Sequence, residues 1–336
     1  VLGMALSKSM LFPLTVGNRW LNVLETNNAH PTVRTQLPAW RMVVALDKED
    51  FRLAKDVLTR AVDSNPGTIP LAWIRLAAVH GLEASTTNLE AADLAASALA
   101  QLAARAELGQ VLDLAQRYGT EAIGERGFAA NYVRGVIAYQ QARERHGSDD
   151  EPTADELVRG LYSEAAGAFR DALSSSDISR YEAAAAGCRR LIGFCFFFRG
   201  EFIAAKDAFL ESIESLPAGE APESLWMAIV SMDKLARNGN SAAEAELEVL
   251  LDRFLEEYPS SDYAPRLVLR RAEGLRQPSV AQVEALLAIP ENSDAHGAAQ
   301  ARATQMLYEL FRSDQEKRIE HGRLEREGHR ARDRET

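Results

Sequence analysis

The residues best suited to chemistry are histidines, cysteines and carboxylates, and their spacing in this sequence forms no recognisable catalytic or metal-binding motif. No H-E-x-x-H or other tight ligand cluster is formed by the six histidines His30, His80, His146, His296, His321 and His329. Cys188 and Cys195 are seven residues apart on one expected helix, which separates them by roughly 10 Å along its axis. That separation is too large for a disulfide, so we expect both cysteines to be small buried side chains.

Nucleotide-binding and hydrolase motifs do not occur in the sequence either. Residues Gly3 to Ser9 resemble a phosphate-binding loop, but Ser7 stands where a glycine must precede the lysine, and no strand comes before it. Neither G-x-G-x-x-G nor G-x-S-x-G is present. The acidic runs Glu256-Glu257 and Asp149–Glu151 are typical of solvated faces or loops. We therefore predict no catalytic residue, no metal ligand, no cofactor and no enzymatic activity.

Composition and charge are those of a folded protein that does not bind nucleic acid. The chain has 336 residues, which is long enough for two domains or one elongated repeat array. Of these residues, 46% are hydrophobic and 26% are charged. The net charge is −11, whereas neutralising phosphates requires clustered Lys and Arg. Residues 312–336 hold 8 basic and 7 acidic side chains, so the remaining residues carry a net charge of −12.

The elements that must position any binding residues are helices. The stretch Asn88 to Arg117 contains one Gly and no Pro, and it is rich in Ala, Leu, Gln and Glu. No convincing run of alternating Val, Ile and Thr is found, so the sequence predicts an all-α fold.

One segment, Ala186 to Gly219, has the pattern of two amphipathic helices divided at Arg199-Gly200. Large residues recur at helical spacing beside Gly193 on the first helix and Ala205 on the second, and these small residues allow the helices to approach closely. Pro217 then ends the second helix.

This segment resembles the tetratricopeptide repeat, whose order and spacing are matched by Ile192-Gly193, Phe196, Gly200, Phe202, Ala205, Phe209, Ser212-Ile213 and Pro217. Arg189 departs from the pattern, because the family often has a large apolar residue there. Weaker copies are Phe51–Pro66, Trp73–His80, Gly160–Leu173 (paired with Phe128–Arg145 across an acidic loop, His146–Pro152) and Leu225–Leu235 with Glu244–Tyr258. Pro217 and Pro259 are 42 residues apart, more than the family's ~34, so we expect an insertion near Asn238–Asn240.

The resemblance covers roughly Asp47 to Tyr258. Between Leu82 and Gly127 the register is unclear, and another helical solenoid such as the HEAT type stays open. The tetratricopeptide resemblance implies an α-solenoid of stacked antiparallel helical hairpins that form a right-handed superhelix. In such a solenoid, neighbouring hairpins cover each other's apolar faces. Two further helices, Tyr263–Arg276 and Val280–Ile289, and a terminal helix, Asp294–Phe311, are expected beyond it.

In this family the first helices of successive hairpins line a concave groove that takes a peptide or a partner helix. Carried onto this sequence, the resemblance assigns the groove to Arg190, Phe194, Phe197 and Phe198, with apolar anchors and one guanidinium for a carboxylate or carbonyl. The alternative is that neighbouring helices bury the FCFFF run as core. The family's clamp for C-terminal carboxylates uses Lys and Asn, but Arg190 and Phe194 occupy those places, so we do not expect it.

The predicted organisation is an N-terminal helical or capping segment (1–45), a helical repeat domain (46–311) and a charged tail (312–336). We expect this tail to be a frayed single helix or disordered, and a docking element is the alternative. Val1–Val16 is apolar but interrupted by Lys8 and Pro13, and it is too short to cross a membrane; it is either a signal remnant or a first packing helix. We expect a cytoplasmic location. The run Tyr258–Pro265 resembles a junction found in bacterial envelope tetratricopeptide proteins, so export to the periplasm is the alternative.

The function expected from these features is that of a protein–protein interaction scaffold or adaptor which binds a peptide or partner helix. The alternative is a non-catalytic recognition or accessory domain of a larger enzyme or bacterial envelope assembly complex. The oligomeric state is left open by the sequence.

Overall fold

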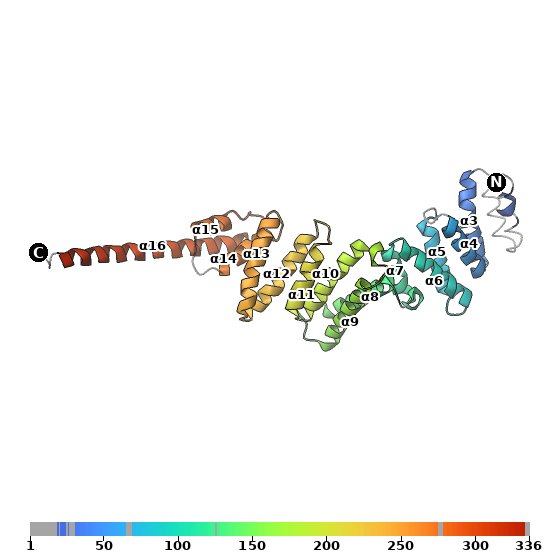
Figure 1. Cartoon of the computed structure of the whole chain (residues 1–336), viewed down its shortest axis with the longest axis horizontal. Coiled ribbons are helices and arrows are strands. Elements are labelled where there is room, and N and C mark those ends of the chain that lie inside the picture. Colours follow the sequence, from blue (N-terminus) through green and yellow to red (C-terminus); the bar gives the residue numbers. More distant parts are fainter. Residues whose placement is uncertain are drawn as a thin grey trace. The chain divides into compact units, whose positions relative to one another are not determined.

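The computed structural model describes residues 19, 21–24, 26, 31–64, 69–124, 126–274 and 278–332 (Figure 1). Its described part is built from helices and contains no strand, which confirms the predicted all-α class. The chain divides into two compact units, Val1–Glu201 and Phe202–Thr336, and each is considered by itself. The apolar segment Val1–Val16, the loop Gly3–Ser9 and His30 lie outside the described residues.

The first unit contains eight labelled helices within the described ranges: α3 (Pro31–Asp47), α4 (Phe51–Ser64), α5 (Leu71–Ala84), α6 (Leu89–Ala104), α7 (Leu108–Tyr118), α8 (Phe128–His146), α9 (Glu156–Leu173) and α10 (Glu182–Phe198). Two short 3-10 turns, Glu121–Ile123 and Ile178–Arg180, lie between them. Helices that follow one another pack together, most extensively α8 with α9, α5 with α6 and α9 with α10. Consecutive packing of this kind is the arrangement of an α-solenoid.

The region between Leu82 and Gly127, whose register the sequence leaves unclear, is built around a close crossing of α5 and α6. Asn88 caps α6, because its side-chain oxygen accepts hydrogen bonds from the backbone nitrogens of Glu90 and Ala91 at 2.8 and 3.2 Å. A Cβ atom at Gly81 would lie only 2.8 Å from backbone atoms of α6. Glycine at this position therefore allows the two backbones to approach closely.

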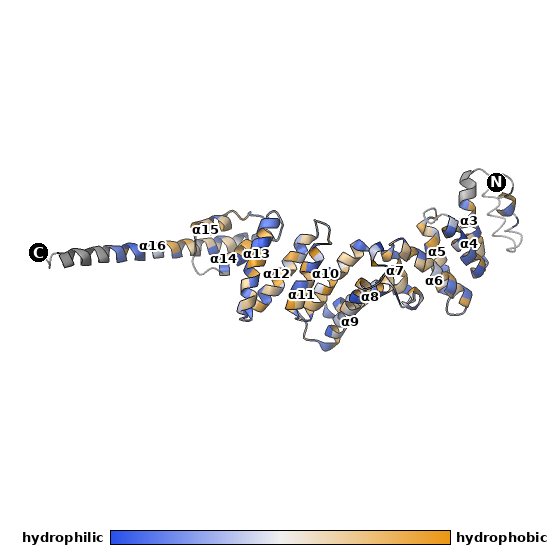
Figure 2. Cartoon of the chain, viewed as in Figure 1, coloured by the Kyte–Doolittle hydropathy of each residue, from blue (hydrophilic) through white to orange (hydrophobic). Residues whose placement is uncertain are grey.

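The second unit contains α11 (Phe202–Ile213), α12 (Ala221–Arg237), α13 (Ser241–Glu257), α14 (Ala264–Gly274), α15 (Val280–Leu287) and α16 (His296–Arg332). Here α11 packs on α12 and α12 on α13, while α14 and α15 pack on the first part of α16. Buried serines Ser212 and Ser224 join α11 to α12 through a 3.0 Å hydrogen bond between their hydroxyls. Figure 2 shows hydrophobic and hydrophilic residues interspersed along these helices, as expected of amphipathic helices that bury one face.

The helices follow a 39-residue spacing. Helix α12 begins and ends 39 residues after α10, and α11, α13 and α15 begin at residues 202, 241 and 280. The turns repeat in the same step: Gly200 and Gly239 both have positive φ, 78° and 85°. Each glycine nitrogen donates to the carbonyl three residues earlier, and the following nitrogen donates to the carbonyl five residues earlier. The helices thus repeat every 39 residues, still more than the family's ~34. The insertion expected near Asn238–Asn240 is not found there, because the turn 238–240 is as long as the turn 199–201.

Helix α16 crosses the predicted boundary at residue 312. It is continuous from His296 to Arg332, so the terminal helix and the first part of the charged tail form one element, which agrees with the single-helix alternative for the tail. Side chains from Phe311 to His321 are all exposed.

Candidate partner-binding surfaces

The four residues that the sequence assigns to a groove lie on α10 and differ in exposure. Arg190 and Phe194 are partly exposed. Phe197 and Phe198 are only 3% and 4% exposed, so these two side chains present almost no surface to a partner. For these two residues the structure matches the alternative in which the FCFFF run is core.

Phe198 is covered by side chains of α8 and α9. Its ring stacks on Tyr162 with centroids 5.2 Å apart, meets the edge of His146 at 5.2 Å, and carries the Arg143 guanidinium 4.6 Å above it. The Thr153 nitrogen donates a 2.8 Å hydrogen bond to the Phe198 carbonyl, which fastens the acidic loop to the end of α10. This cluster joins three helices and a loop, and its role is structural.

His146 is a member of this cluster that the sequence did not single out. Its Nδ1 lies 3.0 Å from the Tyr162 hydroxyl, and burial raises the pKa of that hydroxyl. The contact bridges the C-terminal end of α8 and the first half of α9. No local pattern announces it, because the two residues are brought together by the packing of the helices.

A hollow lies between α12 and α14 in the second unit. It encloses about 240 Å³ and is lined by Trp226, Ile229, Val230, Asp233, Arg237, Arg266, Leu267, Leu269, Arg270 and Glu273. Three of these residues, Ile229, Asp233 and Arg237, lie 39 positions after Arg190, Phe194 and Phe198. The positions of α12 that correspond to three of the four residues assigned on α10 therefore line this hollow.

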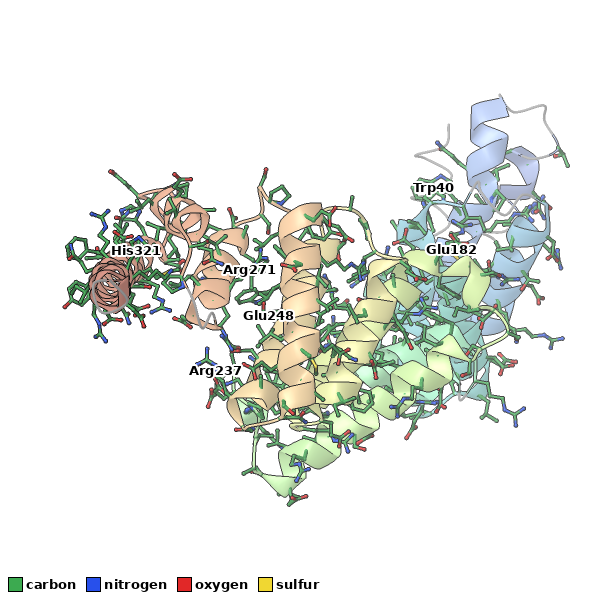
Figure 3. All side chains as sticks on the ribbon, turned by 60° about the vertical axis from the view of Figure 1, so that its left-hand side comes forward. Trp40, Glu182, Arg237, Glu248, Arg271 and His321 are labelled. Atoms are coloured by element: carbon green, nitrogen blue, oxygen red, sulfur yellow. The ribbon has the colours of Figure 1, made fainter. Side chains whose placement is uncertain are left out.

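The polar part of this α12–α14 groove is organised by one carboxylate. Asp233 Oδ2 accepts a hydrogen bond from Arg237 Nε at 2.7 Å, and Oδ1 accepts one from Arg270 Nε at 2.6 Å. Among the described residues, neither guanidinium has another hydrogen-bond or ion-pair partner, so the Nη groups of both are unpaired within this part of the chain. The Asp233 and Arg270 side chains are 20% and 22% exposed, whereas that of Arg237 is 62% exposed. Figure 3 labels Arg237.

The apolar part of the groove begins at Trp226. This half-buried ring stacks on Tyr263 with centroids 5.0 Å apart and planes inclined by 14°. Arg266 is held by both carboxylate oxygens of Asp294, and its hydrogen bonds lower the pKa of that acid. Arg266 also borders a second hollow of about 800 Å³, whose wall includes Glu257 and residues 258–263 of the Tyr258–Pro265 run.

The two cysteines lie in the described part of the chain and are buried. Cys188 and Cys195 are free thiols, and burial raises the pKa of each to about 12, far from the range of a reactive thiolate. The described residues contain no group of three or more His, Cys, Asp or Glu side chains placed to hold a metal ion. Among them, no helix is both long and apolar enough to span a bilayer. No protein-family model matches the chain, and no curated protein matches it.

Proposed function

We propose that this protein is a non-enzymatic interaction module of the tetratricopeptide type, and that it holds a segment of another protein in the α12–α14 groove. The observation that carries the proposal is the pair of arginines tethered by Asp233 in a hollow that the half-buried Trp226 also lines. Arg and Trp are the residues most often found at the energetic centre of protein interfaces.

The Asp233 carboxylate fixes both guanidiniums through their Nε atoms, which leaves the Nη atoms to bind a ligand. A guanidinium held in this way loses less conformational entropy when it binds, and its Nη groups can form charge-assisted hydrogen bonds to a carboxylate or carbonyl. Ile229, Val230 and Trp226 supply apolar surface next to it. The segment that fits best carries an acidic side chain close to an aromatic or aliphatic one.

The resemblance to the tetratricopeptide repeat supports the same assignment, because its binding grooves are lined by the first helices of successive hairpins. Helices α12 and α14 each precede a helix of the 39-residue series, α13 and α15. The longer repeat is a departure from the family, so the proposal depends on the groove residues and not on the repeat length.

The test is selection of ligands from a displayed library of random short peptides, followed by titration of the selected peptides against Trp226 fluorescence. We expect the selected peptides to be enriched in Asp or Glu next to aromatic or aliphatic residues. The combined variant Asp233→Asn, Arg237→Gln and Arg270→Gln removes the polar site without leaving an unpaired charge. It should weaken binding at least about tenfold, equivalent to about 1.4 kcal/mol.

A matched control is available on α14, next to Arg270. Arg271 pairs with Asp252 at 2.8 Å and does not line the groove; it is labelled in Figure 3. The variant Arg271→Gln with Asp252→Asn should leave binding unchanged. Equal losses in the two variants, or a selection without acidic residues, would contradict the proposed site.

A further inference from the structure

Helix α16 has two apolar faces, of which only one is used within its unit. Ala299, Ala303 and Met306 are 0% exposed and pack with side chains of α14 and α15. On the other side, Tyr308, Phe311 and Ile319 are 66%, 62% and 66% exposed. At 100° per residue, Tyr308 and Ile319 lie roughly 200–220° around the helix from Met306, so they point away from the core.

The exposed residues form a continuous stripe and not scattered contacts. Thr304, Tyr308, Phe311, Gln315 and Ile319 follow one another at intervals of four, three, four and four residues. Intervals of three and four place side chains along one seam of a helix, as in helices that pair with other helices. We name this the 304–319 stripe; it is about 23 Å long.

The charges around the stripe favour a partner that carries both signs. Two basic and two acidic side chains flank the stripe, and they pair within the helix as Arg312–Glu316 and Asp314–Arg318 at 3.0 and 2.8 Å. A uniformly acidic or basic partner would leave half of these charges facing like charge. A second copy of α16 brings equal numbers of both signs and an identical apolar seam.

The length of the helix points the same way. All side chains from Phe311 to His321 are exposed, although the helix continues to Arg332. Helices in proteins draw most of their stability from the packing of an apolar face. We propose that two copies of this protein associate through their 304–319 stripes to form a homodimer.

The dimer is expected to be reversible, because a seam of about 23 Å is short compared with interfaces of standard size. Sedimentation velocity of the full chain should show a monomer–dimer equilibrium over the micromolar range. The variant Phe311→Glu with Ile319→Glu should be monomeric throughout that range, with a dissociation constant raised at least a hundredfold. At a concentration where the wild type is monomeric, circular dichroism should show the same helix content for both proteins, since both substituted side chains are exposed.

The control is Lys317→Glu, which makes the same change in net charge at an exposed position on the other side of the helix. It should dimerise as the wild type does. A wild-type chain that stays monomeric, or a dimer equally weakened by Lys317→Glu, would overturn the proposal. The combined groove variant should still dimerise, so this inference stands or falls separately from the proposed function.

Discussion

The arrangement around Asp233 predicts two unequal couplings, which a double-mutant cycle can measure. Asp233 binds Arg270 of α14 and Arg237 of its own helix at nearly equal distances, 2.6 and 2.7 Å. The two contacts differ in solvent exposure, because the Arg270 side chain is 22% exposed and that of Arg237 is 62% exposed. Distance alone would rank the contacts as equal, whereas solvent screening ranks the contact with Arg270 higher.

The magnitudes follow from this difference. A charged hydrogen bond between mostly buried groups contributes about 1–2 kcal/mol to the free energy of unfolding, so we assign that coupling to Asp233 and Arg270. An exposed ion pair four residues apart on a helix contributes about 0.3–0.5 kcal/mol, which we assign to Asp233 and Arg237. The first coupling should be roughly three times the second.

The assay is urea unfolding followed by tryptophan fluorescence. Trp226 is the only tryptophan of residues 202–336, so replacing Trp20, Trp40 and Trp73 by Phe makes the signal specific to the second unit. Each cycle compares Asp233→Ala, one Arg→Ala change and their combination. Couplings of equal size, or a larger coupling to Arg237, would refute the view that burial makes the α12–α14 contact the stronger one.

Three further predictions concern the first unit. Gly81→Ala should lower the free energy of unfolding by about 1–2 kcal/mol, because the clash of the new Cβ atom with α6 outweighs the gain in helix propensity. Gly109→Ala should raise it by about 0.5–1 kcal/mol, because a Cβ atom at Gly109 would have no neighbouring atom within 4 Å. Urea unfolding measures both changes. Asn88→Ala should cost about 1 kcal/mol by the same measurement, because it removes the cap of α6. Burial raises the pKa of Cys188 and Cys195 from 9.0 to about 12, so the contribution of the two thiols to the free energy of unfolding should be complete below pH 9 and lost as pH rises toward 12. At neutral pH, a thiol reagent should label neither cysteine until urea is added.

The parts of the fold that the sequence predicts well are those set by local chemistry. The division at Arg199-Gly200 is confirmed, since α10 ends at Phe198 and α11 begins at Phe202. The turn is readable because only glycine adopts its positive φ without strain. The start of α4 at Phe51 and the end of α9 at Leu173 also agree with the predicted segments, because amphipathic spacing and helix breakers lie close together in the chain.

The exposure of the phenylalanines could not be predicted in this way. Helix α10 is apolar around most of its circumference near its C-terminal end, so its own sequence does not tell which face a neighbour covers. The answer depends on Tyr162, which is 36 residues before Phe198, and on the loop that brings Thr153 to the Phe198 carbonyl. Such contacts are fixed by tertiary packing, which leaves no periodic signal in a single helix.

The interval between Pro217 and Pro259 does not give the repeat length, for a related reason. Pro217 and Pro259 lie outside the helices, where the chain tolerates changes in length, so their interval does not measure the repeat. Gly200 and Gly239 are held by the hydrogen bonds of their turns and give the 39-residue step that the helices follow. Conformationally constrained residues are therefore better markers of a repeat than residues that only end a helix.

The 39-residue step also relates the groove residues predicted on α10 to the residues of the groove that we propose on α12. At equivalent positions α10 has Phe194 and Phe198, whereas α12 has Asp233 and Arg237. An apolar side chain at such a position gains free energy when a neighbouring helix covers it, and Phe198 is covered. A charged side chain at the same position loses hydration if it is covered without full pairing, which favours an open hollow. Repeats with one geometry can thus be closed by aromatic residues in one hairpin and kept accessible by charged residues in the next, and the accessible one is where a partner can bind.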